Sequence, residues 1–229
     1  MKYITIMKIC YIIKTCDKYL DNRVVYQANT CLQHINVNDI FYLTSKPDIS
    51  RRHFGWNTDD SYMCLTLKVL QFFYNIDCDE YDEYDWYVFM DDDTFVFTDR
   101  LTDFLSKLDS TANYYIGREL DHIKKDFCLY MSGGAGYIIS KPLFILLQSH
   151  IKNNGIDFSN KHWCEDLTIG LLIQELVNIH NNSVNLLNDD RFHVGVHQNE
   201  EELESAITFH NVREEEQFNF YKNICKPYS

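Results

Sequence analysis

The 229-residue chain has little of several features that mark whole classes of protein. It contains 3 Pro and 8 Gly and no segment built from Ser, Gly and Pro, which excludes long flexible linkers and collagen-like or mucin-like tracts. Basic residues are also few, since 21 Lys and Arg stand against 34 Asp and Glu, a formal charge of -13. Because nucleic-acid binding relies on cations that neutralise phosphates, we expect no nucleic-acid partner.

A long apolar run is missing as well. The first segment, MKYITIMKICYIIKTC, is interrupted by Lys2, Lys8 and Lys14, well short of the roughly 20 apolar residues that a spanning helix needs. It has no small-residue cleavage site after an uninterrupted apolar stretch, so neither a transmembrane segment nor a secretory signal peptide is predicted. The eight cysteines contain no CxxC pair, which disfavours a structural zinc site and leaves the disulfide state and the compartment open.

What the sequence does contain is an alternation of apolar strands with amphipathic helices. The expected strands are 4–15, 39–44, 86–90, 95–97, 114–117 and 137–139, and the expected helices are 23–35, one after 59–61, 99–108, one from 140, 165–176 and one near 214. With 45% hydrophobic residues, the chain can bury a substantial core. The pattern predicts an α/β sandwich with a mostly parallel central sheet flanked by helices, which binds ligands at the carboxyl ends of its strands.

Three adjacent aspartates, Asp91, Asp92 and Asp93, directly follow five large apolar residues at 86–90. Carboxylates this close repel one another, and a bound cation is the simplest way to hold them together. Oxygen ligands suit Mg²⁺ or Mn²⁺ better than Zn²⁺, and such ions commonly bridge carboxylates to the phosphates of a nucleotide. The alternative is a solvated acidic turn, which the buried strand before the aspartates disfavours.

Four segments, in this order, make the chain resemble a known family. They are YDWYVFMDDDTFV at 84–96, YMSGGAGYIIS at 130–140, WCEDLTIG at 163–170 and ITFHNV at 207–212. These are similar to segments of the fringe and core 1 galactosyltransferase branch of the β1,3-glycosyltransferases, glycosyltransferase family 31. The resemblance implies a GT-A-type, Rossmann-like nucleotide-sugar-binding fold in a single catalytic domain over 1–229. Its donor-binding half would be about 1–117, and its acceptor and catalytic half about 118–229.

The implied activity is a metal-dependent, inverting transfer of a hexose or N-acetylhexosamine from a UDP-sugar to an acceptor hydroxyl, with a β1,3 linkage on a glycan or glycoprotein. Breaking the glycosidic bond places negative charge on UDP, which Mn²⁺ or Mg²⁺ on the diphosphate would stabilise. By the resemblance, Asp93 is the first metal ligand, with Asp91 binding directly or through water. His210 is expected to complete the shell, with His193 and His197 as rivals.

Several residues are expected to contact the donor. The resemblance implies that Asp92 contacts the ribose or the sugar, that Arg23 contacts the nucleotide from the first helix, and that Thr15 belongs to the same donor-binding strand end. Gly133 and Gly134 would let the backbone approach the sugar or diphosphate, because side chains there would block it.

Asp166 is the expected general base. An inverting transfer needs a base on the face of the sugar opposite the leaving group, which takes the proton of the acceptor hydroxyl. The alternative is that Asp166 and Glu165 stabilise the N-terminus of a helix, as acidic residues commonly do. Trp163 and Glu165 adjoin this position and are expected to contact the acceptor.

Two other functions account for parts of the sequence. A catalytically silent nucleotide-sugar-binding or glycan-binding module of the same fold is disfavoured because both Asp93 and Asp166 are retained. Another Mg²⁺-dependent enzyme acting on nucleotides or phosphoesters would explain the aspartates alone. Family members usually carry a membrane anchor and work in the Golgi lumen, whereas this sequence starts near the first strand. We therefore expect a soluble, free-standing enzyme, either of the cytoplasm or of a virus or microbe.

Overall fold

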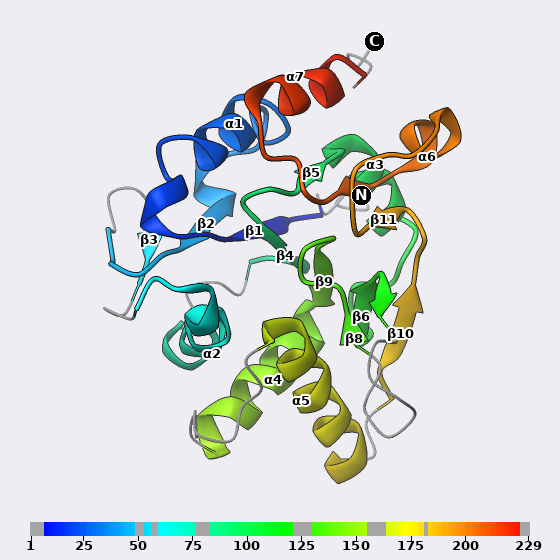
Figure 1. The fold of residues 1–229 in the computed structure, drawn as a ribbon. Coiled ribbons are helices and arrows are strands. Elements are labelled where there is room, and N and C mark those ends of the chain that lie inside the picture. Colours follow the sequence, from blue (N-terminus) through cyan, green and yellow to red (C-terminus); the bar gives the residue numbers. More distant parts are fainter. Residues whose placement is uncertain are drawn as a thin grey trace, which may run out of the picture.

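The central sheet of the protein has the strand order β10-β6-β9-β4-β1-β2-β3 in a computed structural model, which describes residues 7–48, 53–55, 59–76, 83–120, 130–154, 164–180 and 183–224 (Figure 1). Its strands are β1 (Ile9–Lys14), β2 (Ile40–Leu43), β3 (His53–Phe54), β4 (Trp86–Asp91), β6 (Tyr114–Gly117), β9 (Tyr137–Ser140) and β10 (Asn185–Asn188). Strand β9 runs antiparallel to its neighbours β4 and β6, and the other pairings in this sheet are parallel. The predicted mostly parallel sheet is confirmed.

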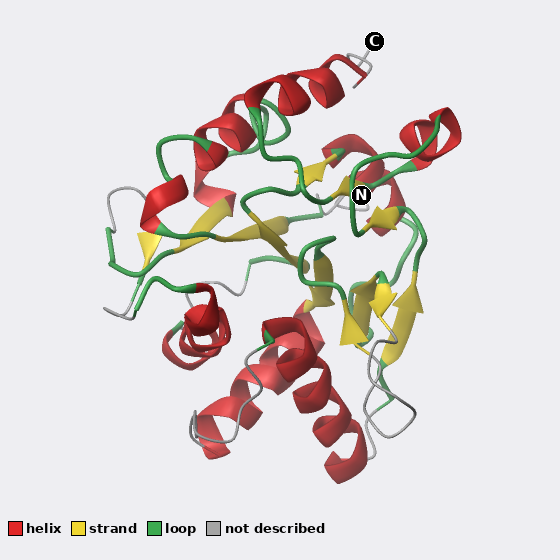
Figure 2. Ribbon diagram, viewed as in Figure 1, coloured by secondary structure: helices red, strands yellow, loops and turns green. Residues whose placement is uncertain are grey.

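Helices cover both faces of this sheet (Figures 1 and 2). The helices are α1 (Arg23–Asn29), α3 (Thr98–Leu105) and α7 (Glu215–Ile224) on one face, and α2 (Leu65–Asn75), α4 (Lys141–Asn154) and α5 (Glu165–His180) on the other. Helix α1 packs against α7, and α2, α4 and α5 pack against one another. The predicted α/β sandwich is therefore confirmed. Among the described residues, no helix combines the length and the apolar character that crossing a bilayer requires.

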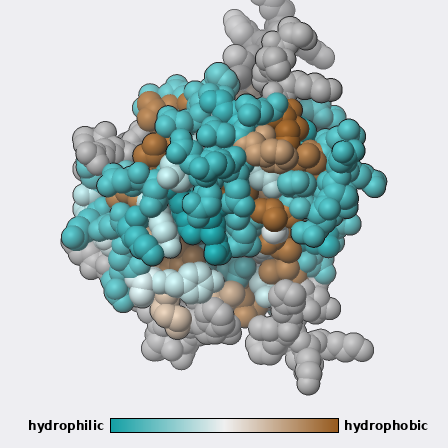
Figure 3. All heavy atoms as spheres, turned by 45° about the horizontal axis from the view of Figure 1, so that its top comes forward, coloured by the Kyte–Doolittle hydropathy of each residue, from teal (hydrophilic) through white to brown (hydrophobic). Residues whose placement is uncertain are grey.

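Strand β4 shows why the sheet needs both layers. Its side chains alternate between the faces. Trp86, Val88 and Met90 pack into the hydrophobic core on the side of α1, α3 and α7, whereas Tyr87 and Phe89 pack into the core on the side of α2, α4 and α5. All five side chains are buried, as expected for a strand with no polar face. The outer surface over α1 and α7 is mostly hydrophilic, with hydrophobic residues in separate areas (Figure 3).

A small second sheet brings the last part of the chain beside the aspartates. It consists of β11 (Phe192–His193), β12 (Thr208–Phe209) and β5 (Phe95–Val96). Strand β12 pairs antiparallel with β5, and the Val212 amide donates a hydrogen bond of 2.9 Å to the Asp93 carbonyl. Residues more than 110 positions apart in the sequence are thereby fixed next to each other.

The remaining elements are short. A two-stranded sheet pairs β7 (Glu119–Leu120) with β8 (Tyr130–Met131), α6 (Glu200–Ser205) precedes β12, and single 3-10 turns occur at Asp17–Tyr19 (η1), Val37–Asp39 (η2) and Tyr62–Cys64 (η4). The helix expected over 23–35 ends at Asn29, because the backbone of Thr30 leaves the helical region with φ -125° and ψ -95°. The helix expected over 165–176 continues instead to His180.

Candidate functional site

A pocket of about 540 Å³ opens where β1 and β4 end. It is lined by the end of β1, the η1 turn, Arg23 of α1, the start of α2, the three aspartates, and the segment with His210 and Arg213. Ligands of α/β sheets usually bind at the carboxyl ends of the strands. The pocket therefore lies where the alternating pattern predicted a ligand.

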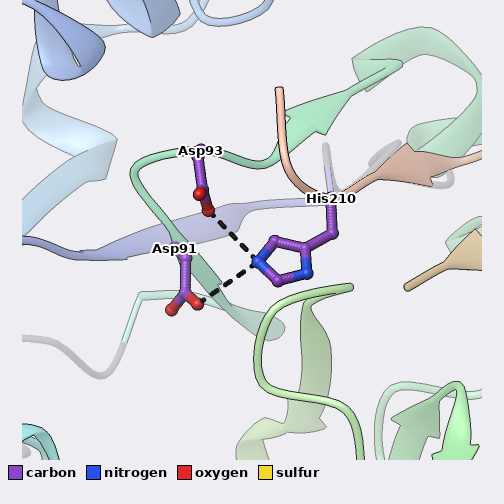
Figure 4. Close-up of side chains that lie close together, drawn as sticks. All are labelled: Asp91, Asp93 and His210. Atoms are coloured by element: carbon purple, nitrogen blue, oxygen red, sulfur yellow. Dashed lines mark ion pairs between the residues drawn. The ribbon is translucent and has the colours of Figure 1, made fainter. Parts of the chain in front are cut away.

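Asp91, Asp93 and His210 form a group with the ligand chemistry of a metal site. One ligand atom from each residue lies within 4.8 Å of the others. The Nε2 atom of His210 is 3.2 Å from Asp93 Oδ1 and 3.8 Å from Asp91 Oδ2 (Figure 4). Two carboxylates and one imidazole are a donor set that can hold a divalent metal ion. We call these three residues the metal group.

The turn that carries the aspartates is held from three sides. The Asp92 amide donates to the Lys14 carbonyl at 3.1 Å, and Gln27 Nε2 donates to the Asp91 and Thr94 carbonyls at 2.9 and 2.7 Å. The Thr94 hydroxyl donates to the Gly134 carbonyl at 2.7 Å. Strand β1, helix α1 and the glycine-rich segment thus fix the direction of the aspartate side chains.

His210 is aimed at the aspartates by its backbone and by its other ring nitrogen. Its amide donates to the His193 carbonyl at 3.1 Å, and Nδ1 lies 3.2 Å from the Val194 carbonyl, which leaves Nε2 facing the carboxylates. The next residue, Asn211, has φ 64°, a left-handed conformation that asparagine tolerates better than most residues.

Gly134 packs directly against the His210 ring. A Cβ atom at position 134 would lie 2.3 Å from His210 Cε1, so only glycine leaves room for the ring as it stands.

The two rival histidines lie elsewhere. His193 stacks on the Phe209 ring at 4.9 Å between centroids. The Nδ1 atom of His197 lies 2.8 Å from the Tyr221 hydroxyl, and its ring stacks on Phe220. Of the three histidines considered from the sequence, the structure brings His210 to the aspartates.

Two arginines and a threonine face the remaining carboxylate oxygens. Arg23 donates to Asp92 Oδ1 at 3.0 Å and to Asp93 Oδ2 at 3.3 Å, and the Thr15 hydroxyl donates to Asp92 Oδ2 at 2.7 Å. Arg213 Nε donates to Asp93 Oδ2 at 3.2 Å. Sequence reasoning missed Arg213, although it directly follows the ITFHNV segment. Two guanidinium groups therefore converge on Asp93, and one of them, Arg23, also bonds Asp92.

These contacts shift the pKa values of the site in different directions. Burial raises the pKa of Asp92 to about 6, against the opposing hydrogen bonds from Thr15 and Arg23. Burial also opposes ionisation of Asp93, but the hydrogen bond with His210 and the arginine charges outweigh it and lower its pKa. The pKa of His210 is raised despite its burial, because Asp93 and Asp91 favour the charged ring.

A second charged cluster adjoins the pocket, which its member Lys14 helps to line. Lys14 and Glu165 side chains are 1% and 3% exposed, and Lys14 Nζ lies 2.9 Å from Glu165 Oε2. The Tyr137 hydroxyl donates to Glu165 Oε1 at 2.5 Å. Burial opposes the charge on Lys14, but the nearby Asp91 and Glu165 carboxylates outweigh it and raise the pKa of Lys14. We call Lys14, Tyr137 and Glu165 the buried network. Neither Lys14 nor Tyr137 was assigned a role in it from the sequence.

Asp166, the expected base, lies at the start of α5 beside this network. Its Oδ2 atom accepts from the Gly133 amide at 2.9 Å, and its Oδ1 atom accepts from the Leu167 amide at 2.8 Å and from the Cys164 thiol at 2.7 Å. The bond to Leu167 is the kind of helix N-terminal contact that the alternative interpretation predicts. Trp163 lies outside the described residues.

The chain matches known proteins along most of its length. The family model described as Fringe-like matches residues 4–224. The glycoprotein-N-acetylgalactosamine 3-beta-galactosyltransferase 1 of Xenopus laevis is 27% identical over 167 residues, which cover 72% of this chain and 44% of that protein. The human chondroitin sulfate glucuronyltransferase is 34% identical over 70 residues, which cover 30% of this chain and 9% of that protein. The matched regions thus span less than half the length of both relatives.

One solved structure is also similar. It is the crystal structure of a glycosyltransferase involved in the glycosylation of the major capsid of PBCV-1, with 11% identity, a TM-score of 0.46, and coverage of 93% of this chain and 98% of that chain. The family model carries the assignment, because it runs through the aspartates, the glycine-rich segment, Asp166 and His210 in one continuous match. The protein is a member of the Fringe-like family.

Proposed function

We propose that this protein is a metal-dependent, inverting glycosyltransferase that moves a hexose or N-acetylhexosamine from a UDP-sugar to an acceptor hydroxyl, forming a β1,3 linkage on a glycan or glycoprotein. The observation that carries the proposal is the metal group in an open pocket of a Fringe-like chain. The name of the Xenopus laevis relative, a 3-beta-galactosyltransferase, supports a hexose donor and this linkage.

The pocket suits a nucleotide-sugar. Its volume of about 540 Å³ is within the usual range for small-molecule sites, roughly 300 to 1,000 Å³. Arg23 and Arg213 would bind the diphosphate, because a guanidinium presents several donors to phosphate oxygens. Asp92 and Thr15 are proposed to contact the ribose or the sugar. The Arg23 guanidinium is held 3.9 Å above the Tyr19 ring, which limits its conformations.

The metal group fits Mn²⁺ or Mg²⁺, with Asp93 Oδ1, Asp91 Oδ2 and His210 Nε2 as the ligand atoms. When bound, such an ion supplies stabilisation of the negative charge that develops on the diphosphate leaving group. His210 is prepared for ligation because Nδ1 bonds the Val194 carbonyl and Nε2 faces the carboxylates. This second contact sets the orientation of the ring.

Asp166 is proposed as the base that accepts the proton of the acceptor hydroxyl. The Gly133 and Leu167 amides hold its two oxygens in place. Asp166 remains partly exposed, so a hydroxyl can approach it. The acceptor subsite would lie beside α5, where Glu165 and Trp163 adjoin Asp166 in the sequence. In the structure, the Glu165 carboxylate is turned inward to Lys14, so its proposed contribution to the acceptor site is through the placement of Asp166.

Binding and turnover of a panel of UDP-sugars test this function. The purified protein is titrated with UDP-galactose, UDP-glucose, UDP-N-acetylglucosamine and UDP-N-acetylgalactosamine, with Mn²⁺ or with EDTA, and UDP release is measured with simple glycosides as acceptors. We expect one donor to bind and react only with Mn²⁺. Asp166→Asn should still bind this donor but lose about 100-fold to 10,000-fold in turnover, the range attributed to a general base.

Controls make the outcomes distinct. Asp103→Ala removes an exposed carboxylate of α3 whose partner is Lys107, just beyond the end of that helix, and it should behave as the wild type. Binding of a donor without any transfer would instead indicate a silent binding module. A folded wild type that binds neither Mn²⁺ nor any of the four donors would contradict the proposal.

A further inference from the structure

Lys14 joins four parts of the site that are distant in the sequence. Its ammonium group, at the end of β1, lies 3.1 Å from Asp91 Oδ1, donates to Glu165 Oε2 at 2.9 Å, and donates to the Gly133 carbonyl at 3.1 Å. An ammonium group has three N–H donors. Two of its contacts are hydrogen bonds, to α5 and to the glycine-rich segment, and the third is an ion pair with β4.

Two of these contacts lead to Asp166. The Gly133 residue accepts a hydrogen bond from Lys14 through its carbonyl and donates one to Asp166 Oδ2 through its amide. Glu165 directly precedes Asp166 in α5, and its carboxylate is fixed between Lys14 and the Tyr137 hydroxyl. The position of the Asp166 carboxylate thus depends on Lys14 through both the peptide of Gly133 and the first residue of the helix.

The third contact leads to the metal group. Asp91 Oδ1 is buried and has no hydrogen bond in the described part of the chain, and the Lys14 charge 3.1 Å away is what compensates it. With Oδ1 held in this way, Oδ2 of the same carboxylate is the atom that faces His210 at 3.8 Å. Lys14 therefore fixes the orientation in which the Asp91 carboxylate faces the pocket.

Stability alone is a weak reason for a lysine in this place. A buried ion pair must repay the desolvation of both charges, and apolar replacements of such pairs are often equally stable or more so. The other buried lysine of the pocket, Lys68, bonds the Thr15 carbonyl and Asp60, and touches neither the metal group nor the segment of Asp166. The partners of Lys14, by contrast, are the residues around which the proposed reaction is built.

We propose that Lys14 is a positioning residue, which orients Asp91 for the metal ion and holds the Asp166 carboxylate at a fixed position relative to Asp91. The proposal rests on the proposed function and adds a residue that acts through its contacts with Asp91, Gly133 and Glu165. Lys14 acts through two hydrogen bonds and one ion pair, so it sets the separation of the proposed leaving-group side and the proposed base side of the site.

The test compares Lys14→Met with Lys14→Met/Glu165→Gln by three readouts: unfolding temperature, Mn²⁺ affinity from calorimetry, and kcat. Lys14→Met leaves the Glu165 carboxylate buried without its partner, so its unfolding temperature should fall. The double variant removes that unpaired charge and should recover part of the lost unfolding temperature, because Asp91 Oδ1 still lacks its cation. If Lys14 positions the site, kcat of the double variant stays about 10-fold to 100-fold below the wild type, the range for residues that orient metal ligands.

The direction of the Mn²⁺ effect separates orientation from charge. Removing a cation 3.1 Å from Asp91 would strengthen Mn²⁺ binding if charge alone mattered. A loss of orientation weakens it instead, and we expect the dissociation constant to rise about 10-fold in both variants. Gln148→Leu is the matched control, because it removes a buried polar side chain of α4 that bonds the Ile76 carbonyl outside the site. It should change stability without changing Mn²⁺ affinity or kcat.

Each remaining outcome is decisive. Recovery of kcat together with the unfolding temperature in the double variant would show that Lys14 only neutralises Glu165, and would overturn the proposal. Unchanged or tighter Mn²⁺ binding in Lys14→Met would overturn it as well. If the wild type binds Mn²⁺ but transfers no sugar, the proposed function fails while the Mn²⁺ affinity of Lys14→Met still decides whether Lys14 orients Asp91.

Discussion

The metal group and the buried network are neighbouring charged clusters that differ in how far their side chains are exposed. In the metal group, Asp91 and His210 side chains are both 23% exposed and face a pocket. In the buried network, Lys14 and Glu165 are 1% and 3% exposed, and each charge is met by another group of the chain. Asp91 borders both clusters, with one oxygen toward each. The two clusters therefore differ in access: Asp91 and His210 face a pocket that a ligand can enter, whereas the Lys14 and Glu165 side chains are almost closed to solvent.

Asp93→Ala is expected to have the largest effect, and it tests the metal group. Asp93 contacts His210, Arg23 and Arg213. Its loss therefore removes one proposed ligand and also the carboxylate that these three side chains share. We expect Mn²⁺-dependent donor binding to fall by more than about 100-fold, the upper end for residues that only support metal ligands. Calorimetry with Mn²⁺ and UDP measures the effect. A variant that binds Mn²⁺ as the wild type does would remove Asp93 from the metal group.

Gly134→Ala tests how closely the histidine is packed. The added Cβ would lie 2.3 Å from His210 Cε1, so the ring must move away from the aspartates. We expect Mn²⁺ affinity to fall about 10-fold, with little change in the rest of the fold. Gly195→Ala is the matched control, because a Cβ there meets nothing within 4 Å. Equal Mn²⁺ affinities in the two variants would show that the ring position is unimportant.

Tyr137→Phe tests the buried network. It removes the hydroxyl that donates to Glu165 Oε1 and leaves that carboxylate oxygen without a donor from Tyr137. We expect a loss of about 2 kcal/mol in the free energy of unfolding, typical of a hydrogen bond to a charged group. Urea unfolding measures it, with Tyr84→Phe as a control outside the network, where the hydroxyl bonds Asn38 and Asp39. A stability equal to the wild type would mean that the bond is dispensable.

The smallest expected effect concerns a charge pair in neither cluster. Burial opposes ionisation of Asp189, but hydrogen bonds from Arg191 outweigh it and lower the pKa of Asp189 below its ordinary value of 3.8. A lowered pKa stabilises the folded state above the unfolded pKa, and this stability is lost as the pH falls through the folded pKa.

Asp189→Asn should therefore cost about 1 kcal/mol or less at pH 7, because Arg191 is partly exposed. The difference from the wild type should shrink as the pH falls below about 3.8, the ordinary value for this carboxyl. Urea unfolding at a series of pH values measures it. A difference that grows toward low pH would have the wrong sign for this pair.

Local pattern was enough to predict much of the fold. The apolar run of β4 with its aspartates, the strand over Tyr114–Gly117 and the helix that begins at Glu165 all have signals within a few residues. The direction of β9 had no such local signal, because an apolar strand has the same pattern whether it pairs parallel or antiparallel. Its antiparallel pairing with β4 and β6 is a property of the assembled sheet.

The candidate site was likewise predicted from the sequence only in part. The aspartates and His210 were expected from their motifs, and the structure brings them together, while their roles stay predictions. Lys14 was part of a strand in the sequence, and its partners Gly133 and Glu165 lie 119 and 151 residues away. Arg213 likewise reaches Asp93 across 120 residues. No local signal reports contacts of this length, because they depend on how β1, β12 and α5 meet.

The pairing of β12 with β5 has a consequence for the order in which the protein matures. His210 is supplied by a segment that joins the aspartates only after β12 has added to β5 and the Val212 amide has reached the Asp93 carbonyl. Contacts of such sequence separation form late, since the loop between them must close first. On the ribosome, the three aspartates are therefore made well before the imidazole that completes their group.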